Sequence, residues 1–133
     1  MNAKQRRPIV RLPGQGRAYQ MPTMRAVFHA DGEESSNRYS VSEWWLEPMS
    51  DGPGAHSHEA NDEIFRIVDG TMSVLVGDRW IDAPSGSVIV VPAGVTHDYA
   101  NRTAAPAALF NVFIPGGFEK NMPDIVKWYE DNG

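Results

Sequence analysis

The chain has 133 residues, the length of a single domain with one hydrophobic core. Hydrophobic residues make up 41% of it, a fraction typical of globular proteins, so general disorder is excluded. Asp and Glu number 17 against 12 Lys and Arg, and the net charge of −5 argues against a broad nucleic-acid-binding surface, while the lack of cysteine excludes disulfides, thiolate metal sites and a cysteine nucleophile.

The beginning of the chain predicts an N-terminal arm, residues 1–18, followed by a single domain over residues 19–133. The arm is rich in Arg, Gly, Pro and Gln and has no hydrophobic periodicity. No element that could read nucleic acid follows its basic residues, so we expect a solvated arm and no nucleic-acid partner. The sequence shows neither the apolar core of a signal peptide nor the roughly 20 apolar residues that cross a bilayer, so we expect a cytoplasmic protein with no membrane partner.

Short runs of β-branched and aromatic residues, separated by 10 prolines and 12 glycines, predict an all-β domain. The dipeptides Asp69-Gly70 and Gly77-Asp78 favour hairpin turns, so we expect an antiparallel meander in the centre of the chain. Because open sheet edges invite association, short strands in a small chain favour a barrel or jelly roll. The predicted strands span residues 24–29, 38–46, 55–58, 64–68, 71–76, 79–81, 87–91, 97–102 and 107–114.

A single helix is predicted at the C-terminal end. Asn121 can cap its first turn, where Pro123 is also favoured. The apolar side chains of Ile125, Trp128 and Tyr129 follow at helical spacing. We expect this helix to lie with its apolar face against the barrel.

Two of the four histidines, His56 and His58, are separated by one residue. On a strand such residues point to the same face, so both imidazoles can reach one metal ion. A third ligand can come from the acidic cluster at residues 59–63, and a fourth from His97, which opens a later predicted strand. Two imidazoles that converge on an apolar interior remain unpaired unless something binds them. We expect the other histidine, His29, to be structural or solvent-facing.

The spacing of these residues resembles the two motifs of the cupin superfamily. The first motif, G(x)5HxH(x)3–4E(x)6G, is matched from the two histidines through Glu63 to Gly70, although the position of its leading glycine holds Ser50. The second motif, G(x)5PxG(x)2H(x)3N, is matched at all its fixed positions: Gly86, Pro92, Gly94, His97 and Asn101. Five such matches arise by chance in under about one in a million placements.

The resemblance implies a small cupin β-barrel, also described as a double-stranded β-helix or jelly roll, with one C-terminal helix. The ligands that it implies for a divalent transition metal are His56, His58, Glu63 and His97. Glu63 is preferred because its distance to Gly70 fits the motif and its side chain is long, and Asp62 is the alternative ligand. Three nitrogens and one carboxylate oxygen suit Fe, Mn, Ni, Co, Cu or Zn.

Strand alternation places Tyr99 and Asn101 on the face of His97, and Phe65 on the face of Glu63. The predicted substrate pocket is therefore lined by Phe65, Tyr99, Asn101 and Phe113. Two interpretations of Tyr99 are open: it donates a hydrogen bond beside the metal, or it is a core residue with its hydroxyl at the rim.

Trp44 and Trp45 are neighbours on one predicted strand, so they face opposite sides of the sheet. The core can cover only one of them, and the other needs a different cover. Many small cupins are dimers, so the resemblance and the tryptophan pair together predict a homodimer.

The segment PGGFE at residues 115–119 resembles the run near the end of quercetinase-like small cupins. The resemblance predicts a metal-dependent enzyme, a dioxygenase whose small enol, enediol or flavonol-like substrate chelates the metal. Glu63 would accept the substrate proton, and Tyr99 and Phe65 would position the substrate, so Glu63 and Tyr99 are the predicted catalytic residues. The alternatives are a metal-dependent sugar isomerase or epimerase and a non-enzymatic cupin that binds a small molecule.

Overall fold

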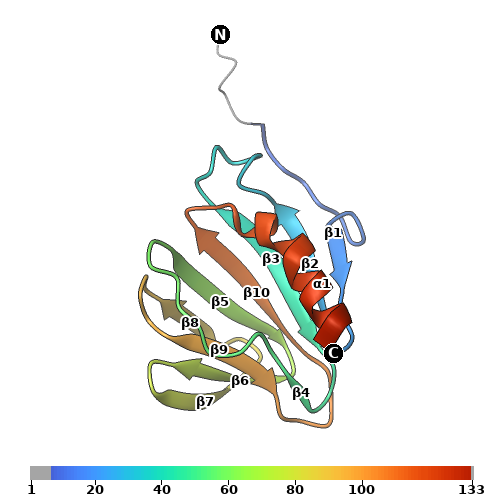
Figure 1. Cartoon of the computed structure of the whole chain (residues 1–133), viewed down its shortest axis with the longest axis vertical. Coiled ribbons are helices and arrows are strands. Elements are labelled where there is room, and N and C mark those ends of the chain that lie inside the picture. Colours follow the sequence, from blue (N-terminus) through green and yellow to red (C-terminus); the bar gives the residue numbers. More distant parts are fainter. Residues whose placement is uncertain (1–6, 133) are drawn as a thin grey trace.

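The computed structural model describes residues 7–132 as two antiparallel sheets and a C-terminal helix (Figure 1). The six-stranded sheet contains, in spatial order, β1 (Arg17–Gln20), β2 (Met24–Ala30), β3 (Ser40–Leu46), β10 (Ala107–Ile114), β5 (Asp62–Asp69) and β8 (Val88–Val91). The four-stranded sheet contains β4 (Ser50–Asp51), β9 (His97–Asn101), β6 (Thr71–Val76) and β7 (Arg79–Pro84). A 3-10 turn, η1 (Phe118–Asn121), leads into α1 (Met122–Asn132).

The hydrophobic core lies between the two sheets. Along β2 and β3, buried residues alternate with more exposed ones, which gives each strand one inward and one outward face. Phe65, Ile67 and Leu109 are almost fully buried, and burial of each such side chain stabilises the fold by about 1.5–3 kcal/mol. Figure 1 shows α1 along the β1–β3 end of the six-stranded sheet, where Ile125 and Tyr129 pack against the core.

Each predicted strand corresponds to a strand in the structure, except the one predicted at residues 55–58. Two of them, residues 71–76 and 107–114, have the predicted bounds. Residues 55–58 form a single bridge instead, in which the backbones of His56 and His97 exchange hydrogen bonds of 3.0 and 2.8 Å. The glycine- and proline-containing segment before this bridge and the turn after it prevent longer pairing. The two-residue strand β4 was not predicted because it is too short to show a pattern.

The predicted central meander is wrong. β5 and β6 follow each other in the chain but lie in different sheets, so Asp69-Gly70 turns a corner between sheets rather than closing a hairpin. Gly70 has a φ of 65° and passes so close to the carbonyl oxygen of Pro106 that a Cβ would lie 2.4 Å from it. Gly77-Asp78 does close the predicted hairpin, between β6 and β7.

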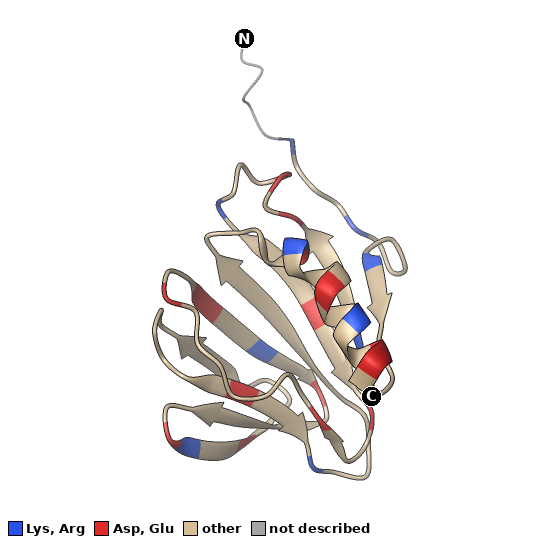
Figure 2. Ribbon diagram, in the orientation of Figure 1, with Lys and Arg blue, Asp and Glu red and all other residues tan. Residues whose placement is uncertain are grey.

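The predicted arm ends earlier than residue 18, because Arg17 and Ala18 pair with β2 as part of β1. The preceding segment is also tied to the domain, since Arg11 forms an ion pair of 2.7 Å with Glu34. Residues 1–6 of the predicted arm lie outside the described residues. Figure 2 shows residues of both charges distributed along the loops, the strands and α1.

The C-terminal helix begins directly after Asn121, as predicted. Its apolar face is narrower than predicted, because Trp128 is 58% exposed while Ile125 and Tyr129 pack against the core. Trp128 lies at the edge of the helix face and contacts the ring of Tyr129 edge-on. Within residues 7–132, none of the helical segments has the length and apolar character that a membrane span requires.

Trp44 is the inward-facing member of the tryptophan pair, and its indole N–H donates to Ser42 Oγ at 2.9 Å. Trp45 on the outer face is half-buried by its own chain, and its indole N–H donates to Glu43 Oε2 at 3.2 Å. This partial cover weakens the argument from the tryptophans for a second subunit. The homodimer stays a prediction.

The turns at Gly70 and Gly77 offer a matched test of the corner between the sheets. Gly70 and Gly77 have φ angles of 65° and 67°, but only at Gly70 does a Cβ meet backbone atoms. Gly77→Ala should cost only the left-handed backbone penalty of about 1–2 kcal/mol, and Gly70→Ala about 1–3 kcal/mol more. Urea denaturation measures both, and equal losses in the free energy of unfolding would contradict the close packing of this corner.

Candidate metal centre

The loop that carries His56 and His58 is fixed from three sides. Asp98 on β9 accepts a hydrogen bond from the N–H of Gly54 at 3.0 Å, and burial raises the pKa of this carboxyl. The hydroxyl of Tyr129 on α1 donates to the carbonyl oxygen of Gly52 at 3.2 Å. The bridge to His97 supplies the third attachment. These contacts position both imidazoles without a regular strand.

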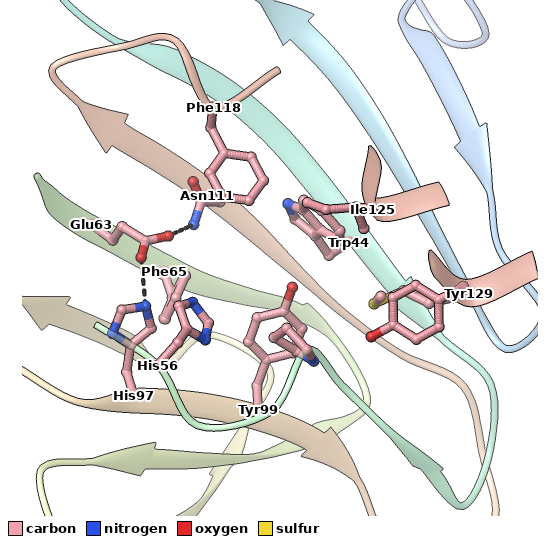
Figure 3. Close-up of a pocket in the computed structure, with 12 residues that line it drawn as sticks. Trp44, His56, Glu63, Phe65, His97, Tyr99, Asn111, Phe118, Ile125 and Tyr129 are labelled. Atoms are coloured by element: carbon pink, nitrogen blue, oxygen red, sulfur yellow. Dashed lines mark hydrogen bonds and ion pairs between the residues drawn. The ribbon is translucent and has the colours of Figure 1, made fainter. Parts of the chain in front are cut away.

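Four side chains from three parts of the chain meet between the sheets. They are His56 and His58 from the loop, Glu63 from β5 and His97 from β9, and one ligand atom from each lies within 4.8 Å of all the others. Figure 3 shows Glu63 and His97 pointing toward each other, with His56 beside them. These are the four residues predicted as metal ligands.

Asp62 points away from this group. Its Oδ1 accepts a hydrogen bond of 2.8 Å from the N–H of Ala93. Neighbouring residues of a strand face opposite sides of the sheet, so only Glu63 can reach the histidines. His29 also lies outside the group, and its Nε2 is 2.9 Å from Glu43 Oε1.

Backbone carbonyls set the tautomers of two histidines. Nδ1 of His56 lies 2.7 Å from the carbonyl oxygen of Gly54, and Nδ1 of His97 lies 3.0 Å from that of Val95. A carbonyl oxygen only accepts hydrogen bonds, so each Nδ1 carries a hydrogen. When the imidazole is neutral, each Nε2 then directs its lone pair into the site, as metal-binding histidines do.

The buried atoms of the site fit a metal ion. Nε2 of His58, Nε2 of His97 and Oε2 of Glu63 are buried and have no ordinary hydrogen-bond partner. Oε2 lies 2.6 Å from His97 Nε2 and 3.4 Å from His58 Nε2, so only a shared proton or a cation can satisfy these lone pairs. The donors match the nitrogen and oxygen ligands that transition metals accept, and they do not select one metal.

Protonation of the metal-free site follows from its burial and hydrogen bonds. Burial lowers the pKa of His58 and leaves this imidazole neutral. Burial also acts on His97, but its contacts with Glu63 and Val95 outweigh it and raise the pKa of His97 above the usual 6.5. For Glu63, hydrogen bonds with His97 and Asn111 outweigh burial and lower the pKa of the carboxyl.

Asn111 was missed in the sequence although it holds the Glu63 carboxylate. Its Nδ2 donates to Glu63 Oε1 at 2.8 Å, which leaves Oε2 facing the histidines. Asn111 faces inward on β10 between Leu109 and Phe113. A polar residue at an inward position between two apolar ones was the signal that could have revealed it.

A cavity of about 50 Å³ begins at the ligand group and extends toward α1. Phe65 and Tyr99 line it, as predicted, together with Trp44 and with Ile125 of α1. A wider groove of about 400 Å³ shares part of its wall with the cavity and reaches Trp128. The metal site therefore lies where a narrow cavity meets an open groove.

Two predicted pocket residues have other positions. Asn101 does not line the cavity: its Nδ2 donates to the carbonyl oxygens of Leu46, Glu47 and Ala105, and the shortest of these bonds is 2.7 Å. Asn101 is buried, as its predicted inward position requires. It lies at the end of β9 opposite His97, however, where its hydrogen bonds hold two loops together. Phe113 packs against the edge of the His58 ring, with 5.0 Å between ring centroids, and so supports a ligand rather than lining the cavity.

Tyr99 directs its hydroxyl into the cavity, between the ligand group and Trp44 (Figure 3). Burial raises the pKa of this phenol well above 10.0, so the hydroxyl stays protonated at neutral pH. A protonated phenol beside a metal site can donate a hydrogen bond to an oxygen of a bound molecule.

The sequence profile of the family described as "Cupin domain" matches residues 43–113, more than half of the chain. The chain therefore belongs to the cupin family. This match confirms the resemblance drawn from the two motifs. No curated protein matches the chain.

Solved structures with the same fold confirm the predicted small cupin β-barrel. KdgF from Halomonas sp. has a TM-score of 0.71 at 15% identity, covering 82% of this chain and 94% of that chain. A predicted oxalate decarboxylase from Thermotoga maritima has a TM-score of 0.66 at 22% identity, covering 69% and 80%. A sugar phosphate isomerase of the cupin superfamily from Silicibacter pomeroyi has a TM-score of 0.62 at 23% identity, covering 74% and 68%. At these identities the likeness shows the fold alone.

The variant Asn111→Leu tests the support of Glu63. It removes the amide donor but keeps a side chain of similar size, so the carboxylate loses its fixed orientation. We expect metal affinity to fall about 10- to 100-fold, measured by competition with a chromogenic chelator. In the control Asn61→Leu, which removes an amide hydrogen bond to the Pro115 carbonyl away from the ligand group, affinity should be unchanged. Equal affinity of both variants would contradict this role.

Metal binding should depend on pH through His97. Its raised pKa keeps the imidazole protonated above pH 6.5, and a metal must displace that proton. Affinity should therefore rise with pH, by up to tenfold per unit below the raised pKa of His97, with proton release. Calorimetric titration in two buffers of different ionisation enthalpy measures both effects, and a pH-independent affinity without proton release would contradict the assignment.

Proposed function

We propose that this cupin is a metal-dependent enzyme, a dioxygenase acting on a small enol- or enediol-like substrate. The observation that carries the proposal is the group of three imidazoles and one carboxylate at the junction of a narrow cavity and an open groove. Without a metal, the buried atoms Nε2 of His58, Nε2 of His97 and Oε2 of Glu63 have only one another as partners, and the adjoining groove gives access to a substrate. Binding a metal in an accessible cavity is the arrangement of a catalytic rather than a purely structural site.

A bound divalent metal supplies Lewis-acid chemistry and, when it is redox-active, chemistry with dioxygen. The chain supplies the remaining functions. Glu63 is ionised at neutral pH because its pKa is lowered, and it is the proton acceptor of the site. The Tyr99 hydroxyl donates a hydrogen bond to a substrate oxygen, and the ring of Phe65 forms the apolar wall against which the substrate is held.

The size of the cavity limits how the substrate lies. A volume of about 50 Å³ holds about three to five water molecules, which is too little for a flavonol. A flavonol-like substrate would have its chelating oxygens at the metal and its rings in the groove of about 400 Å³. Smaller enols and enediols fit without this division.

The metal requirement is tested by elemental analysis of protein purified without chelators. The wild-type chain and the control His29→Ala should hold about one transition-metal ion each, because His29 lies outside the ligand group. His58→Ala should lose the metal and the activity together. Activity that survives in metal-free His58→Ala would overturn the proposal, as would wild-type protein that binds none of Fe, Mn, Ni, Co, Cu or Zn.

Oxygen consumption separates the reaction classes. With a small enediol substrate, the metal-loaded chain should consume dioxygen in proportion to the substrate lost, measured with an oxygen electrode. Substrate conversion without oxygen consumption would identify the alternative, a sugar isomerase or epimerase. Tight binding with the ligand recovered unchanged would identify a non-enzymatic binding protein.

A further inference from the structure

Among residues 7–132, the walls of the cavity and the groove contain no lysine or arginine, and the histidines in these walls all belong to the ligand group. Glu63 is the one carboxylate in either wall, and it belongs to the ligand group. Outside the ligand group, the polar groups that reach the cavity include the Tyr99 phenol and the Asn111 amide, which are neutral hydrogen-bonding groups. Large apolar surfaces, including Trp44 and Phe118, separate them.

The charge of the loaded site follows from its ligands. Three neutral imidazoles and the Glu63 carboxylate around a divalent ion leave a single positive charge in an apolar cavity. A ligand that carries one negative charge at its chelating oxygens neutralises the site. A ligand with two negative charges leaves an excess negative charge without a partner, which is costly where the surroundings are apolar.

From this balance we infer that the site selects chelators with a single negative charge and an uncharged remainder, such as a deprotonated enol, enediol or hydroxyketone, and disfavours phosphate esters and dicarboxylates. The inference rests on the metal site of the proposed function and adds the charge of the substrate. The Tyr99 hydroxyl, which points into the cavity, can donate a hydrogen bond to a chelating oxygen, but one neutral donor does not compensate a second full charge.

Size supports the same selection. The narrow cavity admits only a few atoms beyond the ligand group, and the groove that receives the rest of a ligand is lined by Phe118, Ile125 and Trp128. A phosphate placed in the groove would face mainly these apolar side chains, with the half-buried imidazoles of the ligand loop and the side chain of Asn121, but no arginine or lysine to bind it. An uncharged or apolar substituent of the ligand can lie in this groove without the cost of burying an unpaired charge.

The test compares two probes on the Zn²⁺-loaded full-length chain by calorimetry at neutral pH. Maltol chelates metals through two adjacent oxygens and carries one negative charge. Oxalate also chelates through two oxygens, but it carries two negative charges. Each dissociation constant is divided by that of the same probe for aqueous Zn²⁺, so that intrinsic chelating strength cancels. We expect the normalised affinity for maltol to exceed that for oxalate at least about tenfold.

A positive charge placed in the wall should largely cancel this preference. Ile125 lines both the cavity and the groove, so Ile125→Lys introduces a cation beside the bound ligand. Oxalate should then bind about tenfold more tightly relative to maltol than in the wild-type protein. In Ile125→Gln, a polar but uncharged variant, the wild-type preference for maltol should persist.

The outcomes separate the inference from the proposed function. Zn²⁺ binding with equal or tighter normalised binding of oxalate overturns the charge selection and leaves the metal site intact. A chain that binds none of Fe, Mn, Ni, Co, Cu or Zn overturns the proposed function, and the inference with it. If Ile125→Lys does not fold, as shown by circular dichroism, the comparison of the two probes on the wild-type chain still decides the question.

Discussion

Burial of the Glu63 carboxylate is the constraint around which the site is arranged. A carboxylate enclosed between two apolar sheets requires compensation on every side. His97 faces one of its oxygens at 2.6 Å, and Asn111 donates to the other at 2.8 Å. Because these partners come from β9 and β10, on opposite sheets, the charge of one residue fixes how the two sheets face each other at this end of the barrel.

The same residues that close the fold also form the site. Tyr129 on α1 lines the cavity and fastens the ligand loop at Gly52, so the helix acts both as a wall and as an anchor. Phe118 on η1 lies close to the rings of His58, Phe113 and Trp44 and connects the approach to the helix with the ligand group. The C-terminal segment is thus part of the metal centre although it contributes no ligand.

The fold itself does not define the reaction, because similar barrels are found in a predicted oxalate decarboxylase and in a sugar phosphate isomerase. The distinguishing features lie in the cavity wall. Apolar rings, the phenols of Tyr99 and Tyr129, and the absence of lysine and arginine among the described lining residues point to a substrate that brings its charge to the metal rather than to the protein. Function in this chain is therefore argued from the lining residues and not from the topology.

The sequence alone determined the ligand group, since the histidine and glutamate spacing and the turn residues are local patterns that the barrel requires. It also determined most strands, because their alternation is visible residue by residue. Only the tertiary structure decided that β5 and β6 belong to different sheets, that Asn101 fastens loops, and that Asn111 holds Glu63. These outcomes depend on which strands lie side by side, and contacts between residues 48 positions apart, as in Asn111 and Glu63, leave no local pattern in the sequence.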